Sequence, residues 1–356
     1  MKASLLLVFI FLLFPLLPAQ SEAARKLVDE GVELHDLGNY AGAVAKYNAA
    51  LEMEEGDYFI AAAEKATTLF FMEEFEACIE LSEGLIKRYP REDALSQVYT
   101  TLGNALDLLG KPEEAIDTYE RAIARFPEDY MLRFNLGVTY LRKGETERGK
   151  KNLIAGINTY PYHPGSHFAL GITLAAENKR TPAILALLRF FLLEIGTQRS
   201  FQAYETLCVL LEGNIQEKSR KSVNISMNPD AMEEDGSPDN FYFPDFKLDW
   251  EANMAQGKKF RKLARKMNTV ELRTEQVWSI LQTSVNMMDE GKLKGPLTDL
   301  YIPFFKELEE RGYLETLMYL AHADSGERYA KKWLEDHFEE VKSLLDWAFG
   351  EGEGKN

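Results

Sequence analysis

Apolar residues recur every three to four positions along most of the chain, and no long stretch alternates between apolar and polar residues as a strand does. This spacing places the apolar side chains of each segment on one face of a helix. The hydrophobic content of 46% is sufficient for a buried core. The pattern therefore predicts an all-α protein, and the length of 356 residues allows about two domains.

The apolar pattern repeats along the first half of the chain. The segments LGNALDLLG, LGVTYLRKG and LGITLAAEN align with one another and start 34 residues apart, at positions 102, 136 and 170. Each is followed by a second apolar pattern after a turn such as Gly110-Lys111-Pro112. Gly suits the left-handed residue past a helix end, and Pro suits the first turn of a helix. Each repeat therefore predicts two antiparallel helices joined by a tight turn.

The second pattern of each repeat has small residues where two helices must approach closely. One such position holds, in successive repeats, Ala43, Cys78, Ala115, Gly149 and Ala183. A second position, seven residues later, holds Ala50, Leu85, Ala122, Gly156 and Phe190. Between them stand Tyr47, Ser82, Tyr119, Leu153 and Leu187. One pair of helices cannot bury its apolar face alone, so we expect the pairs to stack into a solenoid.

These repeats resemble the tetratricopeptide repeat (TPR) family. The resemblance covers about residues 24–197 in five repeats, of which the third and fourth fit the pattern best and the second and fifth depart most from it. It implies an all-α superhelical solenoid of helix-turn-helix repeats. We expect one more helix, within 200–216, to cap the array, so that the solenoid spans 24–218.

The N-terminus has the layout of a secretory signal peptide at residues 1–23. Lys2 precedes an apolar run from Leu5 to Leu17, and the small residues Ser21 and Ala23 favour cleavage near Ala23–Ala24. The run is shorter than the roughly 20 residues of a membrane-spanning helix, although a retained anchor is the alternative. We therefore expect an exported protein, periplasmic or secreted if the organism is bacterial. A leader, repeats and a C-terminal region in this order also resemble exported bacterial TPR proteins.

The composition changes after the predicted solenoid. Residues 219–240 are polar, with Pro, Gly and clustered charges, and are predicted to form a linker. Residues 241–350 are predicted to form a helical C-terminal region that begins with the aromatic segment FYFPDFKLDW at 241–250. The helix expected at 183–195 is apolar on all sides, so we expect it to be covered, either by another part of the chain or by a partner segment.

Charge and motifs argue against several function classes. The net charge of −16 disfavours nucleic-acid binding, and the chain lacks a Gly-rich phosphate loop, a Gly-x-Ser-x-Gly elbow and Cys-x-x-Cys. His163 and His167 could share a zinc ion, but Pro164 is expected to begin the helix and to leave His163 outside it. Cys78 and Cys208 are expected to be buried thiols without a disulfide. The sequence therefore predicts a protein that is not an enzyme and that needs no cofactor or metal.

The TPR resemblance implies that the first helix of each repeat lines a concave groove. Carried over to this chain, the register gives a largely apolar partner-binding site formed by Phe70, Phe71, Asn104, Leu108, Phe134, Val138, Leu141, Arg142, Phe168 and Ile172. The basic residues of a TPR carboxylate clamp are missing, apart from Arg142. Large apolar surfaces usually mark interaction sites, so we expect an unidentified protein or peptide partner.

Alternatives remain for the groove and for the function. The chain's own segment 241–250 could occupy part of the groove. An enzyme would need polar residues of the C-terminal region to converge on a pocket, which their spacing does not suggest. The basic cluster at 258–266 (KKFRKLARK) is interpreted as a solvated helix face, and contact with an anionic membrane is the alternative.

Overall fold

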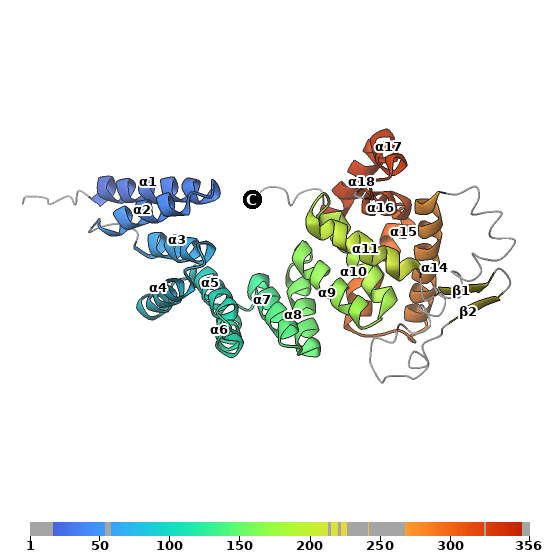
Figure 1. Ribbon diagram of the computed structural model, residues 1–356, viewed down its shortest axis with the longest axis horizontal. Coiled ribbons are helices and arrows are strands. Elements are labelled where there is room, and N and C mark those ends of the chain that lie inside the picture. Colours follow the sequence, from blue (N-terminus) through green and yellow to red (C-terminus); the bar gives the residue numbers. More distant parts are fainter. Residues whose placement is uncertain are drawn as a thin grey trace, which may run out of the picture. The chain divides into compact units, whose positions relative to one another are not determined.

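The computed structural model describes residues 17–53, 58–212, 215–219, 222–225, 241, 268–323 and 325–350. Its contacts divide the chain into two compact units, Met1–Pro127 (unit 1) and Glu128–Asn356 (unit 2). The all-α prediction is confirmed: Figure 1 shows helices along almost all of the described chain.

Unit 1 consists of three consecutive helix pairs. Its helices are α1 (Leu17–Asp36), α2 (Tyr40–Leu51), α3 (Tyr58–Phe71), α4 (Phe75–Arg88), α5 (Leu95–Leu108) and α6 (Pro112–Arg125). Each pair turns at one residue with a left-handed backbone, namely Gly38, Glu73 or Gly110. The predicted turn at Gly110 with Pro112 in the first turn of the next helix is thereby confirmed.

The small residues of unit 1 stand where the helices of a pair approach most closely. A Cβ atom added to Gly103 of α5 would lie 2.4 Å from the ring of Tyr119 in α6, far closer than real Cβ contacts. Gly31 of α1 has the same relation to Tyr47 of α2, at 2.5 Å. In the second repeat the pair is Ala66 and Ser82, both buried and both small. Tight packing of a large ring against glycine therefore defines the first and third pairs.

Unit 2 continues the helix pairs and adds the C-terminal helices. Its elements are α7 (Tyr130–Arg142), α8 (Thr146–Thr159), α9 (Pro164–Ala176), α10 (Arg180–Leu193), α11 (Gln198–Glu212), β1 (Ile215–Ser219), β2 (Ser222–Ile225), α14 (Thr269–Asp289), α15 (Pro296–Glu310), α16 (Leu314–Ala321), α17 (Arg328–Asp336) and α18 (Phe338–Phe349). Gly144 and Asn178 are the left-handed turn residues of its two pairs.

Helix α10 is buried on every side, as its apolar sequence predicts. All residues from Arg180 to Leu192 are buried. The expectation of a cover is confirmed, because α10 contacts α9, α11, α15 and α16. Figure 1 shows these helices gathered around α10. One apolar core thus joins the last helix pair to the C-terminal helices, with Phe190, Leu187 and Phe305 among its fully buried members.

The segment after α11 contains a two-stranded hairpin that the sequence did not predict. Strands β1 and β2 pair antiparallel with Ile215 opposite Ile225, so β2 lies within the predicted linker. The expected capping helix is present as α11 and ends at Glu212. The apolar–polar alternation of IQEKS and SVNI extends over only a few residues, too short for a reliable strand signal.

Several sequence predictions fall wholly or partly outside the described residues. Of the expected signal peptide, only residues 17–23 are described, as the beginning of α1. The basic cluster 258–266 lies outside, and of segment 241–250 only Phe241 is described, buried in the core of unit 2. Among the described helices, none combines the length and the apolar character needed to cross a membrane.

Candidate partner-binding site

The first helices of the pairs carry the residues predicted to contact a partner. These first helices are α1, α3 and α5 in unit 1 and α7 and α9 in unit 2. The second helices are α2, α4 and α6 in unit 1 and α8 and α10 in unit 2. Four of the predicted site residues, on α3 and α5, therefore belong to unit 1, and the other six belong to unit 2.

Two of the predicted site residues expose large apolar side chains in unit 1. Phe71, at the end of α3, is 51% exposed, and Leu108, at the end of α5, is 53% exposed. Phe71 stands two residues before Glu73 and Leu108 two before Gly110, so both occupy the same place in their repeats. Helices α3 and α5 are in contact. We call the surface formed by Phe71, Leu108 and Asn104 the first-helix surface.

Neighbouring rings hold Phe71 in a fixed position. Its ring meets the rings of Phe70 and His35 edge-on, with centroids 5.6 and 5.0 Å apart, and stacks on Tyr40 at 5.9 Å. His35 is itself fixed by a 2.8 Å hydrogen bond between Nδ1 and the Oγ1 atom of Thr68. Phe70 is half-buried, so it supports Phe71 more than it exposes a surface of its own. A rigid aromatic ring loses little entropy on binding, which suits an anchor residue.

The amide oxygen of Asn104 accepts a hydrogen bond within its own repeat. The hydroxyl of Tyr119 donates a 2.6 Å hydrogen bond to the Oδ1 atom of Asn104. An asparagine amide has two N–H donors besides its oxygen. Asn104 can therefore offer its NH2 group to a peptide carbonyl beside Leu108, while Tyr119 fixes its orientation.

The predicted site residues of unit 2 are more deeply packed. The apolar residues Phe134, Leu141, Phe168 and Ile172 are half-buried against the core of the unit. Phe134 meets the His163 ring edge-on at 4.6 Å, and Phe168 lies 5.3 Å from Phe190. Val138 is half-buried and Arg142 is exposed. Their part in partner binding stays a prediction, as does occupation of the groove by segment 241–250.

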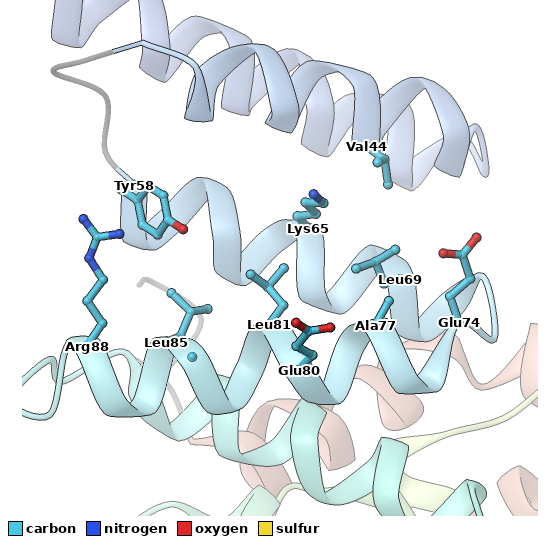
Figure 2. A pocket seen from close by; sticks show the side chains of 11 residues that line it. Val44, Tyr58, Lys65, Leu69, Glu74, Ala77, Glu80, Leu81, Leu85 and Arg88 are labelled. Carbon is cyan, nitrogen blue, oxygen red and sulfur yellow. The ribbon is translucent and has the colours of Figure 1, made fainter.

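A groove between α2, α3 and α4 was not found from the sequence. Its volume is about 620 Å³, and its apolar floor includes Leu69, Leu81 and Leu85. Figure 2 shows it running along α4, with Arg88 at one end, Glu74 at the other, and Lys65 and Glu80 near the middle. Ala77 and Gly84 lie on the same side of α4 and are exposed. We call this feature the α4 groove.

A buried polar cluster in unit 2 was also missed by the sequence analysis. Arg273 of α14 donates a 3.0 Å hydrogen bond to Nε2 of His322, whose Nδ1 donates to the Met318 carbonyl at 2.7 Å. Burial, helped by the Arg273 charge, lowers the pKa of His322 to about 4. Arg273 also reaches the Tyr204 hydroxyl of α11, at 3.4 Å. The separations of 49 and 69 residues hid this cluster, which ties three helices together around a neutral imidazole.

The possible zinc pair has a structural explanation instead. Helix α9 begins at Pro164 with His163 as its cap, as predicted. His167 is buried; its Nε2 donates to the Pro161 carbonyl and its Nδ1 accepts from the Tyr301 hydroxyl, both at 3.0 Å. Burial lowers the pKa of His167 to about 3. Among the described residues, no group of three or more His, Cys, Asp and Glu side chains could hold a metal ion.

The two cysteines differ in their surroundings. Both are free thiols. Cys78 is fully buried at the small position of the second repeat, as predicted, and burial raises the pKa of its thiol to about 11. The expectation that Cys208 is equally buried was wrong, because it is only half-buried on α11. Its apolar neighbour Val209 is 70% exposed, so an apolar run of residues did not mean burial here.

Arg189 is a buried cation on the apolar helix α10, and the sequence alone does not show what stabilises its charge. Its side chain is buried in α10, and its guanidinium lies 4.1 Å above the ring of Phe304 and 5.7 Å from that of Tyr162. Nη1 has no hydrogen-bond partner in the described part of the chain. Burial lowers the pKa of Arg189 to about 10. The aromatic faces, not a carboxylate, stabilise this charge.

Comparison with known proteins finds a family match for part of the repeats. Residues 100–149 match the family model described as tetratricopeptide repeat. The TPR repeat-containing protein MJ1428 of Methanocaldococcus jannaschii is 27% identical over 133 residues, which are 37% of this chain and 23% of that protein. The matched part thus spans about a quarter of the length of that relative.

Solved structures resemble the chain at low identity. TTC0263, a thermophilic TPR protein of Thermus thermophilus, is 19% identical with a TM-score of 0.46, covering 52% of this chain and 100% of that one. PilF of Pseudomonas aeruginosa is 20% identical with a TM-score of 0.43, covering 54% and 90%. YrrB, described as a TPR protein with an unusual peptide-binding site, is 19% identical with a TM-score of 0.38, covering 52% and 98%.

The family match and the fold agree in the same residues. The matched segment 100–149 covers most of α5, all of α6 and α7 and the beginning of α8, and it contains the turns at Gly110 and Gly144. The helix pairs before and after it follow the same construction, with a left-handed residue between their two helices. Residues 100–149 therefore match the tetratricopeptide repeat family, and the neighbouring helix pairs share the same construction.

Proposed function

We propose that this protein is a scaffold that binds a protein or peptide partner through the first-helix surface of unit 1. One observation carries the proposal: Phe71 and Leu108 are each about half exposed at equivalent positions of neighbouring first helices. Half of the large apolar side chains of the same helices are buried in the core, including Phe59, Leu69, Leu102 and Leu106. Exposed apolar side chains in a row are typical of an interaction surface.

The chemistry of this surface suits a peptide segment with two apolar side chains. Phe71 and Leu108 would each cover one of them, and the Asn104 amide beside Leu108 would donate to a backbone carbonyl between them. Aromatic residues are common among the positions that contribute most to binding. Phe71, fixed by His35 and Tyr40, is accordingly expected to contribute more than Leu108.

A peptide-display selection tests this proposal. The full chain, immobilised, is offered a random library of peptides of about 12 residues, the length that spans several repeats when extended. Selected peptides are then titrated in solution against the wild type and Phe71→Glu. We expect the charge to weaken binding by about 2 kcal/mol or more, that is, at least about thirtyfold, because a carboxylate must be desolvated.

The matched control places the same charge elsewhere in unit 1. Ala124→Glu adds a carboxylate at an exposed position of α6, a second helix, and should leave peptide affinity unchanged. Equal affinities of the wild type and Phe71→Glu for every selected peptide would contradict the proposal.

We further propose that the chain is exported. The support is the apolar run from Leu5 to Leu17 behind Lys2, with small residues at positions 21 and 23. In a bacterial host, the exported product should begin at Ala24, as read by N-terminal sequencing. The double substitution Leu12→Arg with Leu13→Arg places two charges in the middle of the run, so this variant should keep its leader and stay inside the cell. Export of both forms would contradict the proposal.

A further inference from the structure

Gly84 is a glycine that the fold itself does not require. It lies inside α4, where glycine costs about 1 kcal/mol relative to alanine. A Cβ atom added there would meet nothing within 4 Å, and its backbone is not left-handed. The other helical glycines in the described residues each have a neighbour within 4 Å of the added atom, as Gly103 has Tyr119. The missing side chain therefore leaves room outside the protein's own packing.

That room opens into the α4 groove. Gly84 lies seven residues after Ala77, two helical turns along the same side of α4, and both are exposed. Leu81 and Leu85 stand between and beside them, and Leu69 of α3 forms the opposite part of the floor. Figure 2 shows the long axis of the groove following α4. Small residues on a helix allow the axis of a second helix to approach closely.

The dimensions and the apolar floor fit a helix. Helix α4 has 14 residues, which at 1.5 Å per residue gives about 21 Å. An amphipathic helix of about four turns could lay its apolar side chains at i, i+4 and i+7 onto such a floor. The groove belongs to the side of α3 that carries Lys65 and Leu69, so it is distinct from the first-helix surface around Phe71.

The charges around the groove indicate the direction of such a helix. Arg88 marks the C-terminal end of α4, where its guanidinium lies 4.2 Å from the centroid of the Tyr58 ring, and Glu74 stands at the N-terminal end. In the described part of the chain, neither side chain forms an ion pair, and neither do Lys65 and Glu80 nearer the middle. A helix that runs antiparallel to α4, acidic in its first turn and basic in its last, would pair with Arg88 and Glu74. The same charges also stabilise that helix through its dipole.

We propose that the α4 groove is a second binding site, which accepts an amphipathic helix of a partner protein antiparallel to α4. Gly84 and Ala77 provide the close approach, and Arg88 and Glu74 fix the direction. The site goes beyond the proposed first-helix surface, because it uses the second helices α2 and α4 and the opposite side of α3.

Two designed peptides test the proposal on the full chain. Each is a labelled helical peptide of about 14 residues with leucine at i, i+4 and i+7; one has glutamates first and lysines last, and the other has them reversed. Fluorescence anisotropy should show binding of the first peptide and affinity weaker by about tenfold for the second, a difference of about 1.4 kcal/mol. Equal affinities, or no binding of either peptide up to about millimolar concentration, would overturn the proposal.

The variant Gly84→Leu tests whether binding is lost because the groove is filled and not because the fold is damaged. Its Cβ atom meets nothing within 4 Å, so we expect the leucine side chain to occupy the groove, and its higher helix propensity should leave the thermal midpoint equal to or above that of the wild type. We expect Gly84→Leu to weaken binding of the first peptide by at least about tenfold. Ala124→Leu adds the same side chain to the exposed surface of α6 and should have no effect. Unchanged affinity of a folded Gly84→Leu would overturn the proposal.

Phe71→Glu keeps this inference distinct from the proposed function. Peptide binding at the α4 groove should survive Phe71→Glu, while binding at the first-helix surface should not. If Phe71→Glu no longer bound the designed peptide while Gly84→Leu still did, the peptide would bind at the first-helix surface. That result would overturn the second site. Sedimentation velocity tests whether a second copy of the chain occupies the groove. If the wild type self-associated and Gly84→Leu did not, the occupant would be a second copy, and the proposal of a partner protein's helix would be overturned.

Discussion

A single left-handed residue joins the two helices of each pair. Gly38, Gly110 and Gly144 fill this place in three pairs, whereas Glu73 and Asn178 do so in the other two, with φ of 61° and 58°. Residues with a Cβ atom adopt this backbone at a cost of about 1 kcal/mol or more, and asparagine tolerates it better than glutamate. The second repeat therefore carries local strain at its turn.

We expect Glu73→Gly to raise the free energy of unfolding by about 0.5–1 kcal/mol, the strain relieved less the added freedom of the unfolded chain. Urea unfolding followed by circular dichroism measures the change. Asn178→Gly is the matched substitution and should gain less. A loss of stability in Glu73→Gly would contradict this explanation of the turn.

Glycine has opposite consequences at two helical positions of unit 1. Gly103→Ala would press a methyl group into the buried ring of Tyr119, so we expect a loss of about 1–3 kcal/mol. Gly84→Ala meets open space and should gain up to about 1 kcal/mol from helix propensity. Thermal unfolding of both variants beside the wild type checks the contrast. Changes of the same sign would show that the two glycines do not differ as the packing indicates.

The buried His322 links stability to pH. Its pKa is lowered to about 4 in the folded protein, from an ordinary value of 6.5. Between these values the unfolded chain binds a proton that the folded protein does not, so stability is complete above about pH 6.5 and falls as the pH drops, by about 1.4 kcal/mol per unit. His167, with a pKa lowered to about 3, acts in the same direction. NMR titration of the His322 imidazole should show no protonation down to about pH 5; a midpoint near 6.5 would contradict its burial.

At the scale of elements, α10 shows how far sequence alone could reach. Its uniform apolar character predicted burial, and the 34-residue register of segments 102–110, 136–144 and 170–178 predicted the helix pairs. Neither feature could identify the covering helices, because α15 and α16 follow α10 by more than a hundred residues and carry no repeat signal. The short strands β1 and β2 were missed for the opposite reason, since too few residues alternate.

Substitutions of the two arginines of α10 test how the fold stabilises a buried charge. Arg189 lies among aromatic rings, and its Nη1 atom has no hydrogen-bond partner in the described chain, so Arg189→Met should raise the free energy of unfolding by about 1 kcal/mol. Arg180 instead donates from Nε to the Leu210 carbonyl of α11 at 3.0 Å. Arg180→Met should therefore cost about 1–3 kcal/mol by leaving a buried carbonyl unpaired. Urea unfolding compares the two; a large loss in Arg189→Met would mean that its charge is needed for folding.

At the scale of the whole molecule, the sequence identified a candidate surface more readily than its detailed chemistry. Phe71 and Leu108 followed from the repeat register, because exposed positions recur with the repeat. The α4 groove could not be predicted in this way, because it depends on the open space beside Gly84, which the sequence alone does not show. The Arg273–His322 contact joins residues 49 positions apart, outside any repeat period. Local periodicity thus predicts helices and their exposed faces, while pockets and polar clusters depend on packing between distant segments.

The proposed partner binding by the first helices of unit 1 can be tested along the backbone of the whole chain. Amide hydrogen exchange of the full chain, with and without a peptide selected from the display library, tests it most directly. We expect slower exchange in the last turns of α3 and α5, where Phe71 and Leu108 lie, and loss of that protection in Phe71→Glu. Protection confined to other helices, with α3 and α5 unchanged, would contradict binding at the first-helix surface.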